Sequence, residues 1–224
     1  MIDFTLIRSK RKTIAIQILD GKVVVRAPHY STMSAIERFI TDKEKWIETH
    51  LKESKERIEQ KNNFSLAYGD PILLNGLYYP ITPRPGDTAG FDGDTFYIPA
   101  GLSPEGVKFC CIGVYRMLAG KYLKARTYEI AEKMSVKPSA VRINSAKTRW
   151  GSCSGARSIN YSWMLIMADD AIIDYVIVHE LTHITEMNHS ARFWALVGKY
   201  IPDYQERKAR QRELQNKLVC ENWA

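Results

Sequence analysis

Short β-type patterns and one long helical pattern fill the N-terminal part of the chain. Three runs rich in Ile, Val and Thr predict strands, and they cover residues 4–8, 12–19 and 22–27. Asp20-Gly21 lies between the last two runs and predicts a hairpin turn. Beyond it, Ser31 or Thr32 can cap a helix to about residue 60, because apolar residues recur there at helical spacing.

The middle of the chain combines strand patterns, punctuated by glycine and proline, with a second long helix. The strand-like runs are residues 72–74, 78–81 and 95–98. Asn75-Gly76 is a further hairpin signal, so we expect a small antiparallel sheet. Ser103-Pro104 places a capping residue directly before a proline, which predicts a helix from there to about Met134.

Strand patterns return before a strongly apolar helix. The two strand candidates are residues 140–145 and 159–167, joined by a turn region around Gly151. Residues 171–178 are apolar enough for a buried helix, with Asp169 or Asp170 as its N-cap. Ser190 can cap another helix to about Tyr200, and a basic helix closes the chain.

Composition places the chain among globular proteins. A hydrophobic content of 45% over 224 residues is ample for a core, and no apolar run approaches the ~20 residues that span a bilayer. Four cysteines without paired metal-type spacing, and with no signal peptide before them, predict reduced thiols in a cytoplasmic protein. Cys153 is a candidate nucleophile or ligand, although a packed small hydrophobe is the better interpretation.

The charge of the chain permits a polyanionic partner. The formal net charge is +7 and the pI is about 9.2, with basic clusters at residues 8–12 and 207–212. Glu206 and Glu213 flank the second cluster, which is typical of a solvated helix face, and the first resembles the polar edge of a hairpin. Nucleic-acid binding therefore stays an alternative rather than the leading interpretation.

The strongest chemical signal is the motif that begins at His179 and continues with Glu180 to His183. Residues four apart on a helix lie about 40° apart around the axis and about 6 Å along it, so the two imidazoles project side by side. Two imidazoles placed in this way can bind one metal ion. The alternative is a pair of hydrogen-bonded core histidines.

A hydrolytic zinc site takes three protein ligands and leaves the fourth position for water, so a third ligand is expected. His189 is the favoured candidate if the helix ends before it, and Asn188 tolerates the left-handed conformation that would turn the chain back. Glu186 lies on the same face as the histidine pair and is the alternative, as a ligand or as a residue supporting a ligand imidazole. Metzincin proteases have glycine at this position, which argues against that class.

The motif also predicts a reaction. One Zn²⁺ ion lowers the pKa of water to about 7, and Glu180 stands beside it as general base for attack on a peptide carbonyl. The group that stabilises the oxyanion stays open. The candidates, of which Tyr175 lies on the helix face of His179, are Arg149, Tyr161, Tyr175 and Tyr200.

A peptide substrate needs an extended position beside the metal helix. The run 159–167 is the candidate strand for binding it by main-chain hydrogen bonds, with an ordinary core strand as the equal alternative. The residues expected beside the substrate are Asn160, Tyr161, Ser162 and Trp163.

Several stretches spread over the chain together resemble a known family. They are residues 8–13, 24–28, 45–47, 149–153, 179–183 and 188–194. These stretches are similar to the YgjP-like family of HExxH metallopeptidases, relatives of the SprT-like proteins, and the likeness extends nearly end to end.

The resemblance implies an α+β fold. A zincin-like catalytic domain, with its active-site helix beside an antiparallel sheet, would follow a β-rich N-terminal portion with one helix. We expect these parts to be residues 1–101 and 102–224.

The resemblance also implies the site. One zinc ion would be bound by His179, His183 and His189, with Glu180 catalytic. Glu186 falls where the family often has an acidic residue, which favours a supporting role over ligation.

The predicted function is a zinc-dependent metallopeptidase that acts on peptide or protein substrates. The alternative is a nucleic-acid-associated binding protein or, by analogy with the SprT-like relatives, a protease that acts on DNA-bound proteins. No zinc ribbon of paired cysteines follows the metal helix to carry such binding.

Overall fold

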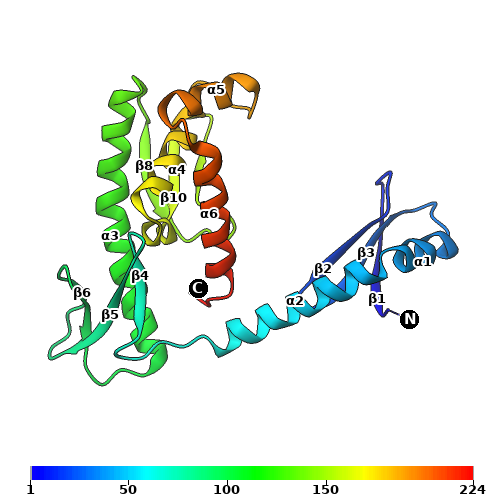
Figure 1. The fold of residues 1–224 in the computed structure, drawn as a ribbon, viewed down its shortest axis with the longest axis horizontal. Coiled ribbons are helices and arrows are strands. Elements are labelled where there is room, and N and C mark those ends of the chain that lie inside the picture. Colours follow the sequence, from blue (N-terminus) through cyan, green and yellow to red (C-terminus); the bar gives the residue numbers. More distant parts are fainter. Residues whose placement is uncertain (1, 224) are drawn as a thin grey trace. The chain divides into compact units, whose positions relative to one another are not determined.

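The computed structural model describes residues 2–223 and confirms the α+β class. Within these residues it has six α-helices and three small sheets (Figure 1). Contacts divide the chain into two compact units, one made of residues up to Phe64 with Val219–Asn222 and the other of Ser65–Leu218 with Trp223. None of the described helices is both long and apolar enough to cross a membrane.

The first unit contains a three-stranded sheet. Its strands, in the order β1-β3-β2, are β1 (Phe4–Ser9), β2 (Ala15–Leu19) and β3 (Lys22–Pro28). The predicted hairpin is present, because β2 and β3 pair antiparallel and Asp20 and Gly21 have the positive φ values, 48° and 70°, that such a turn requires. The central strand β3 supplies Val23, Val25 and Ala27 to the buried core of this unit.

Two helices, rather than the single one expected, follow this sheet. They are α1 (Met33–Asp42) and α2 (Glu44–Asn63). Thr32 caps α1 as predicted, since its side chain accepts from the Ala35 amide. At Lys43 the backbone leaves the helical region (φ −112°, ψ 11°) and its amide bonds back to the Ile40 carbonyl, which closes α1 before α2 begins.

The second unit begins with a mixed sheet. Its strands, in the order β4-β5-β7-β6, are β4 (Pro71–Leu74), β5 (Leu77–Arg84), β6 (Gly90–Phe91) and β7 (Phe96–Pro99). The expectation of a wholly antiparallel sheet is wrong for one pair, because β6 intervenes in the chain and β7 returns parallel to β5. These strands group with the second unit, and the Tyr115 hydroxyl donates to the Leu73 carbonyl at 2.6 Å. The division into domains 1–101 and 102–224 stays a prediction.

Helix α3 (Pro104–Lys133) is the long helix predicted after Ser103, whose side chain accepts from the Gly106 amide. It packs against β8 (Ala140–Asn144), the 3₁₀ helix η1 (Trp163–Met167) and α4 (Asp170–Thr182) (Figure 1). The other elements of this part of the chain are β9 (Gly151–Cys153), β10 (Ser158–Ser162), α5 (Ala191–Tyr200) and α6 (Tyr204–Val219).

The sheet beside α4 has the order β8-β10-β9. It is mixed rather than antiparallel as expected, since β10 pairs parallel with β8 and antiparallel with β9. The crossover between β8 and β10 contains β9, which allows the two outer strands to lie on opposite sides of β10.

The tip of the β4–β5 hairpin holds the start of α4. The amides of Asn75 and Gly76 donate to the carbonyls of Ile166 (2.9 Å) and Met167 (3.0 Å) at the end of η1. Gly76 has a φ of +78°, and a Cβ added to it would lie 2.8 Å from the Cβ of Asp169. The hairpin therefore fits directly against the residue that caps α4.

We expect Gly76→Ala to reduce the free energy of unfolding by about 3 kcal/mol or more, because a disfavoured φ and a backbone-supported clash add together. Gly101→Ala is the matched control, since Gly101 has a φ of +79° and no atom within 4 Å of the added Cβ. Its expected cost is about 1–2 kcal/mol. Urea unfolding of both variants measures the difference, and equal midpoints would show that the Asp169 contact is unimportant.

Candidate active site

Helix α4 is nearly inaccessible to solvent and carries the first two residues of the motif, His179 and Glu180. Asp169 is its N-cap, as predicted, and accepts from the Ile172 amide at 3.0 Å. Apolar residues surround its axis, which is typical of a helix buried on every side. A helix enclosed in this way holds its functional side chains in fixed positions.

Polar contacts from two other helices fix α4 along its length. Arg126 of α3 makes a two-pronged ion pair with Asp174, with its Nε 2.7 Å from Oδ1 and its Nη2 2.6 Å from Oδ2. These hydrogen bonds raise the pKa of Arg126 above its ordinary value. From α6, Arg210 contacts Asp169 at 2.5 Å and Arg207 donates to the Ala171 carbonyl at 3.1 Å.

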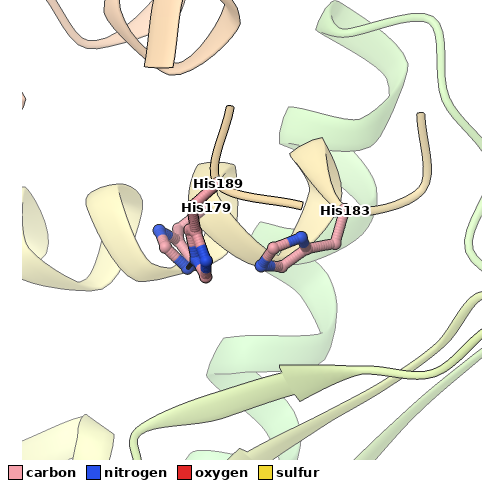
Figure 2. Close-up of side chains that lie close together, drawn as sticks. All are labelled: His179, His183 and His189. Atoms are coloured by element: carbon pink, nitrogen blue, oxygen red, sulfur yellow. Dashed lines mark hydrogen bonds between the residues drawn. The ribbon is translucent and has the colours of Figure 1, made fainter. Parts of the chain in front are cut away.

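Three histidines meet at the end of α4. His179 lies in its last turn, His183 is its C-cap, and His189 lies in the loop before α5. Figure 2 shows the rings of His179 and His189 side by side, with His183 beside them. One nitrogen from each ring can be chosen so that all three lie within 4.8 Å of one another, and the two Nε2 atoms of His179 and His189 are 3.0 Å apart.

Helix α5 supports this cluster through the ring of Phe193. Ser190 caps α5, as predicted, by accepting from the Phe193 amide at 3.3 Å. The fully buried Phe193 ring then lies 4.6–4.9 Å from each of the three imidazole centroids. This aromatic contact to all three rings could not be found from local periodicity.

The chain turns after α4 in a way that differs from the expectation. The amides of Thr185 and Glu186 both bond to the Thr182 carbonyl, at 3.1 and 2.9 Å, so successive tight turns end the helix. Asn188 is not among the residues with positive φ, and the prediction of a left-handed turn there is wrong. Glu186 contacts His183 through its backbone carbonyl, 3.1 Å from Nδ1, rather than through its carboxylate.

The electrostatics of the cluster favour neutral imidazoles. Burial, with the neighbouring His183, His189 and Lys208, lowers the pKa of His179 to about 3. Burial also lowers the pKa of His183. Neutral imidazole is the form that binds a metal ion, and the convergence of three imidazoles fits a divalent transition metal. The Nε2 atoms of His179 and His189 lie 3.0 Å apart, and a cation would stabilise this approach when both nitrogens are unprotonated.

Glu180 is a buried carboxyl, with 6% of its surface exposed. Burial raises its pKa to about 7, against the opposing effect of the Arg149 guanidinium. Its side chain lies on the backbone of Gly151, where an added Cβ would be 2.7 Å from Oε1. Because the Glu180 carboxyl lies against Gly151, the first residue of β9 must be small.

A cleft of about 410 Å³ opens beside these groups. His179, Glu180 and His189 line it, as do both main oxyanion candidates, Tyr175 and Arg149. Burial raises the pKa of Tyr175 to about 12, so its hydroxyl stays protonated and able to donate.

The two other tyrosines considered as oxyanion donors lie outside this cleft. Tyr161 is fully buried, and its hydroxyl accepts from Thr127 at 3.4 Å. Tyr200 is not among the residues that line the cleft.

The predicted substrate strand is contradicted by the topology. β10 is the central strand of its sheet, so both of its edges are already paired and the edges of Asn160, Tyr161 and Ser162 are closed to a peptide. Trp163 lies in the 3₁₀ helix rather than in a strand and is 1% exposed. Among the described strands, the outer one beside Glu180 is β9.

Helix α6 contributes a wall of the cleft that the sequence pattern did not reveal. Lys208, Gln211 and Gln215 line it. Gln215 also accepts from the Trp150 indole at 3.0 Å and so joins α6 to the segment that leads into β9. The alternating charges along α6 are typical of a solvated helix, and they do not predict the contact between Gln215 and Trp150.

A comparison with family models matches residues 12–214 to the metallopeptidase domain of the YgjP-like proteins. The chain belongs to the YgjP-like family. Membership makes it a hydrolase of the peptidase class that acts on protein substrates, and the histidine cluster indicates its metal site. The family resemblance inferred from the motifs is confirmed. A search of curated proteins found no significant match.

Two solved structures are similar to part of this chain. They are crystal structures of metallopeptidase zymogens, Pyrococcus abyssi abylysin and Methanocaldococcus jannaschii jannalysin. Each is 22% identical to this chain with a TM-score of 0.38. The matches cover 43% and 42% of this chain and 94% and 96% of the respective zymogen chains.

We expect Arg126→Met to reduce the free energy of unfolding by roughly 1–2 kcal/mol, because it leaves the partly buried Asp174 carboxylate without its partner. Lys133→Met on the same helix is the control, since it removes an exposed pair with Glu129 and should cost below about 0.5 kcal/mol. Chemical denaturation measures both, and an equal cost would mean that the Arg126 pair does not hold α4.

Proposed function

We propose that the protein is a zinc-dependent metallopeptidase in which His179, His183 and His189 bind one Zn²⁺ ion and Glu180 is the general base. One observation carries this proposal: three imidazoles converge, and two of them, those of His179 and His189, line the same cleft as a buried carboxyl whose pKa is near neutrality. Structural zinc sites use four protein ligands, whereas three ligands leave a position for the reacting groups.

Zinc is the metal that suits this donor set best. Imidazole nitrogens bind zinc well, and the ion needs no preferred geometry beyond what the three rings provide. When bound, zinc supplies Lewis-acid chemistry, acidifying water and polarising a carbonyl group. The carbonyl of Glu186 accepts from Nδ1–H of His183, which leaves Nε2 of that ring unprotonated, with its lone pair available to the metal ion.

Glu180 moves the proton in this mechanism. Its carboxylate takes a proton from the attacking water and returns it to the leaving amine nitrogen, so that no covalent intermediate with the protein forms. Burial prepares it for both steps, because a pKa of about 7 allows the group to accept and to release a proton near neutral pH. The contact with Gly151 keeps the carboxylate beside β9.

Tyr175 and Arg149 are the candidates for stabilising the oxygen on which negative charge develops. Both line the cleft, and both are donors at neutral pH. Tyr175 comes from the enclosed helix α4, whereas Arg149 comes from the exposed segment before β9. A donor on α4 is better fixed, which favours Tyr175 for this role.

We place the substrate along β9 rather than β10. An extended peptide can pair with the outer edge of β9 and would then pass directly beside Glu180. The short length of β9, Gly151–Cys153, suits a site that binds only the few residues around the reacting bond.

Three of the arginines in the two basic clusters make contacts within the fold. Nη1 of Arg8 donates to the carbonyls of Pro28, His29 and Ser31. In the second cluster, Arg207 and Arg210 contact the start of α4. These contacts favour a peptide substrate over a polyanionic partner.

We expect the protein to bind one zinc ion per chain. We expect His179→Ala, His183→Ala or His189→Ala to weaken zinc binding by more than about 100-fold, because removing a ligand lowers the affinity more than removing a residue that supports a ligand. His29→Ala, which changes an exposed histidine outside the cluster, should leave it unaltered. Metal analysis and chelator competition give the values. Unchanged zinc binding in the triad variants would refute the ligand assignment.

We expect Glu180→Gln to lower kcat on peptide substrates on the order of 10²–10⁴-fold while zinc binding is retained, because only proton transfer is lost. Gly151→Ala should also lower kcat, since the new methyl group displaces the carboxylate. Gly155→Ala in the following turn is the control, with no atom within 4 Å of its Cβ. Full activity of zinc-loaded Glu180→Gln would exclude the proposed mechanism.

A further inference from the structure

The charges that line the cleft are unequal in sign. In the described part of the chain, its ionisable lining residues other than histidine and tyrosine are Arg149, Lys208 and Glu180. Glu180 is buried and engaged against Gly151, whereas Arg149 and Lys208 are exposed. A substrate that enters the cleft therefore meets two cations that belong to different elements.

Arg149 is an exposed residue on the wall of the cleft. Within residues 2–223 its guanidinium makes no ion pair and no hydrogen bond, and its recorded effect is electrostatic, on Glu180. A guanidinium presents a planar fork of donors that matches a carboxylate. An unpaired arginine on a cleft wall is thus suited to bind a carboxylate of the substrate.

Lys208 provides the second cation, from α6. Its ammonium lies 4.7 Å from the centroid of the Trp194 ring and contributes to the lowered pKa of His179. Its neighbours on α6 differ from it, because Arg207 pairs with Asp203 and Arg210 pairs with Asp169. Of these three basic side chains, Lys208 is the one that faces the cleft without an acidic partner among the described residues.

The position of Arg149 limits where the substrate's charge must lie. The reacting carbonyl has to pass beside Glu180, and Glu180 lies on Gly151. Arg149 precedes Gly151 by two residues, and this length of chain spans at most roughly 7 Å. Its side chain therefore reaches groups close to the reacting bond rather than distant parts of a substrate.

We infer that this peptidase selects peptides carrying a carboxylate within about two residues of the bond that it cuts, and that Arg149 and Lys208 bind this group. The inference rests on the proposed function, because a preference in kcat/KM can be measured only if the protein cleaves peptides. The carboxylate can belong to an acidic side chain or to the C-terminus of the peptide, and both sources offer the same chemistry to the two cations.

The kinetic test uses a peptide that the zinc-loaded protein cuts. Variants carry Glu or Gln at each position within two residues of the cut bond, and each ends in a free carboxylate or an amide. We expect kcat/KM to favour the carboxylate member of a pair by about 10-fold or more, the effect of one charge-assisted hydrogen bond. A preference for Glu identifies the side chain, and one confined to the free C-terminus identifies terminal carboxylate recognition.

Variants then test which residues of the protein bind the carboxylate of the substrate. Arg149→Met and Lys208→Met should each reduce the ratio of kcat/KM between the Glu and Gln peptides by at least about threefold, whatever their absolute rates. Arg212→Met, an exposed charge on α6 that does not line the cleft, should leave the ratio unchanged. If Arg149→Met slows both peptides equally, Arg149 acts on the reaction itself and the inference is overturned.

A binding measurement separates this inference from the proposed function. Zinc-loaded Glu180→Gln protein is titrated into fluorescein-labelled peptide pairs that differ only in one carboxylate, Glu against Gln and a free C-terminus against an amide, and followed by anisotropy. Tighter binding of the carboxylate member of a pair, lost in the Arg149→Met double variant and weakened by salt, supports the inference even if no peptide is ever cut. Equal or absent binding within both pairs overturns it, even if the wild-type protein cleaves peptides.

Discussion

The enclosure of α4 is the constraint on which the site depends. This helix is buried on its apolar sides by its own unit, capped by Asp169, and held by ion pairs and hydrogen bonds from α3 and α6. His179 and Glu180 belong to it, and His183 closes it. An element with so little freedom places adjacent side chains in fixed directions, which metal binding and proton transfer both require.

Burial has two chemical consequences at this helix. It lowers the pKa of His179, which keeps the imidazole neutral and available to a metal ion, and it raises that of Glu180, which brings the carboxyl toward neutrality. The same loss of hydration thus acts in opposite directions on a base that is charged when protonated and on an acid that is charged when deprotonated. Adjacent residues on one helix acquire different tasks in this way.

The walls of the cleft come from segments distant in sequence. The segment before β9 and the helix α6 both line it, and the hydrogen bond between Trp150 and Gln215 joins residues 65 positions apart. In the proposed mechanism α4 therefore supplies the reactive groups, while the walls supply the groups that a substrate meets. Among the described residues, Arg149 and Lys208 on these walls have no acidic partner in an ion pair, whereas Asp169 and Asp174 of the α4 region both pair with arginines.

Local patterns determined a large part of this protein. The spacing of His179, Glu180 and His183 indicated the site, and the capping signals at Asp169, Ser190 and Ser103 predicted where three helices begin, because caps and helical spacing are contacts between near neighbours in the chain. Only the tertiary structure decided that β10 is central and β9 outer, that Phe193 contacts all three imidazoles and that α6 lines the cleft. Strand order and long-range packing depend on which distant surfaces fit together, and periodicity within a segment carries no record of its partner.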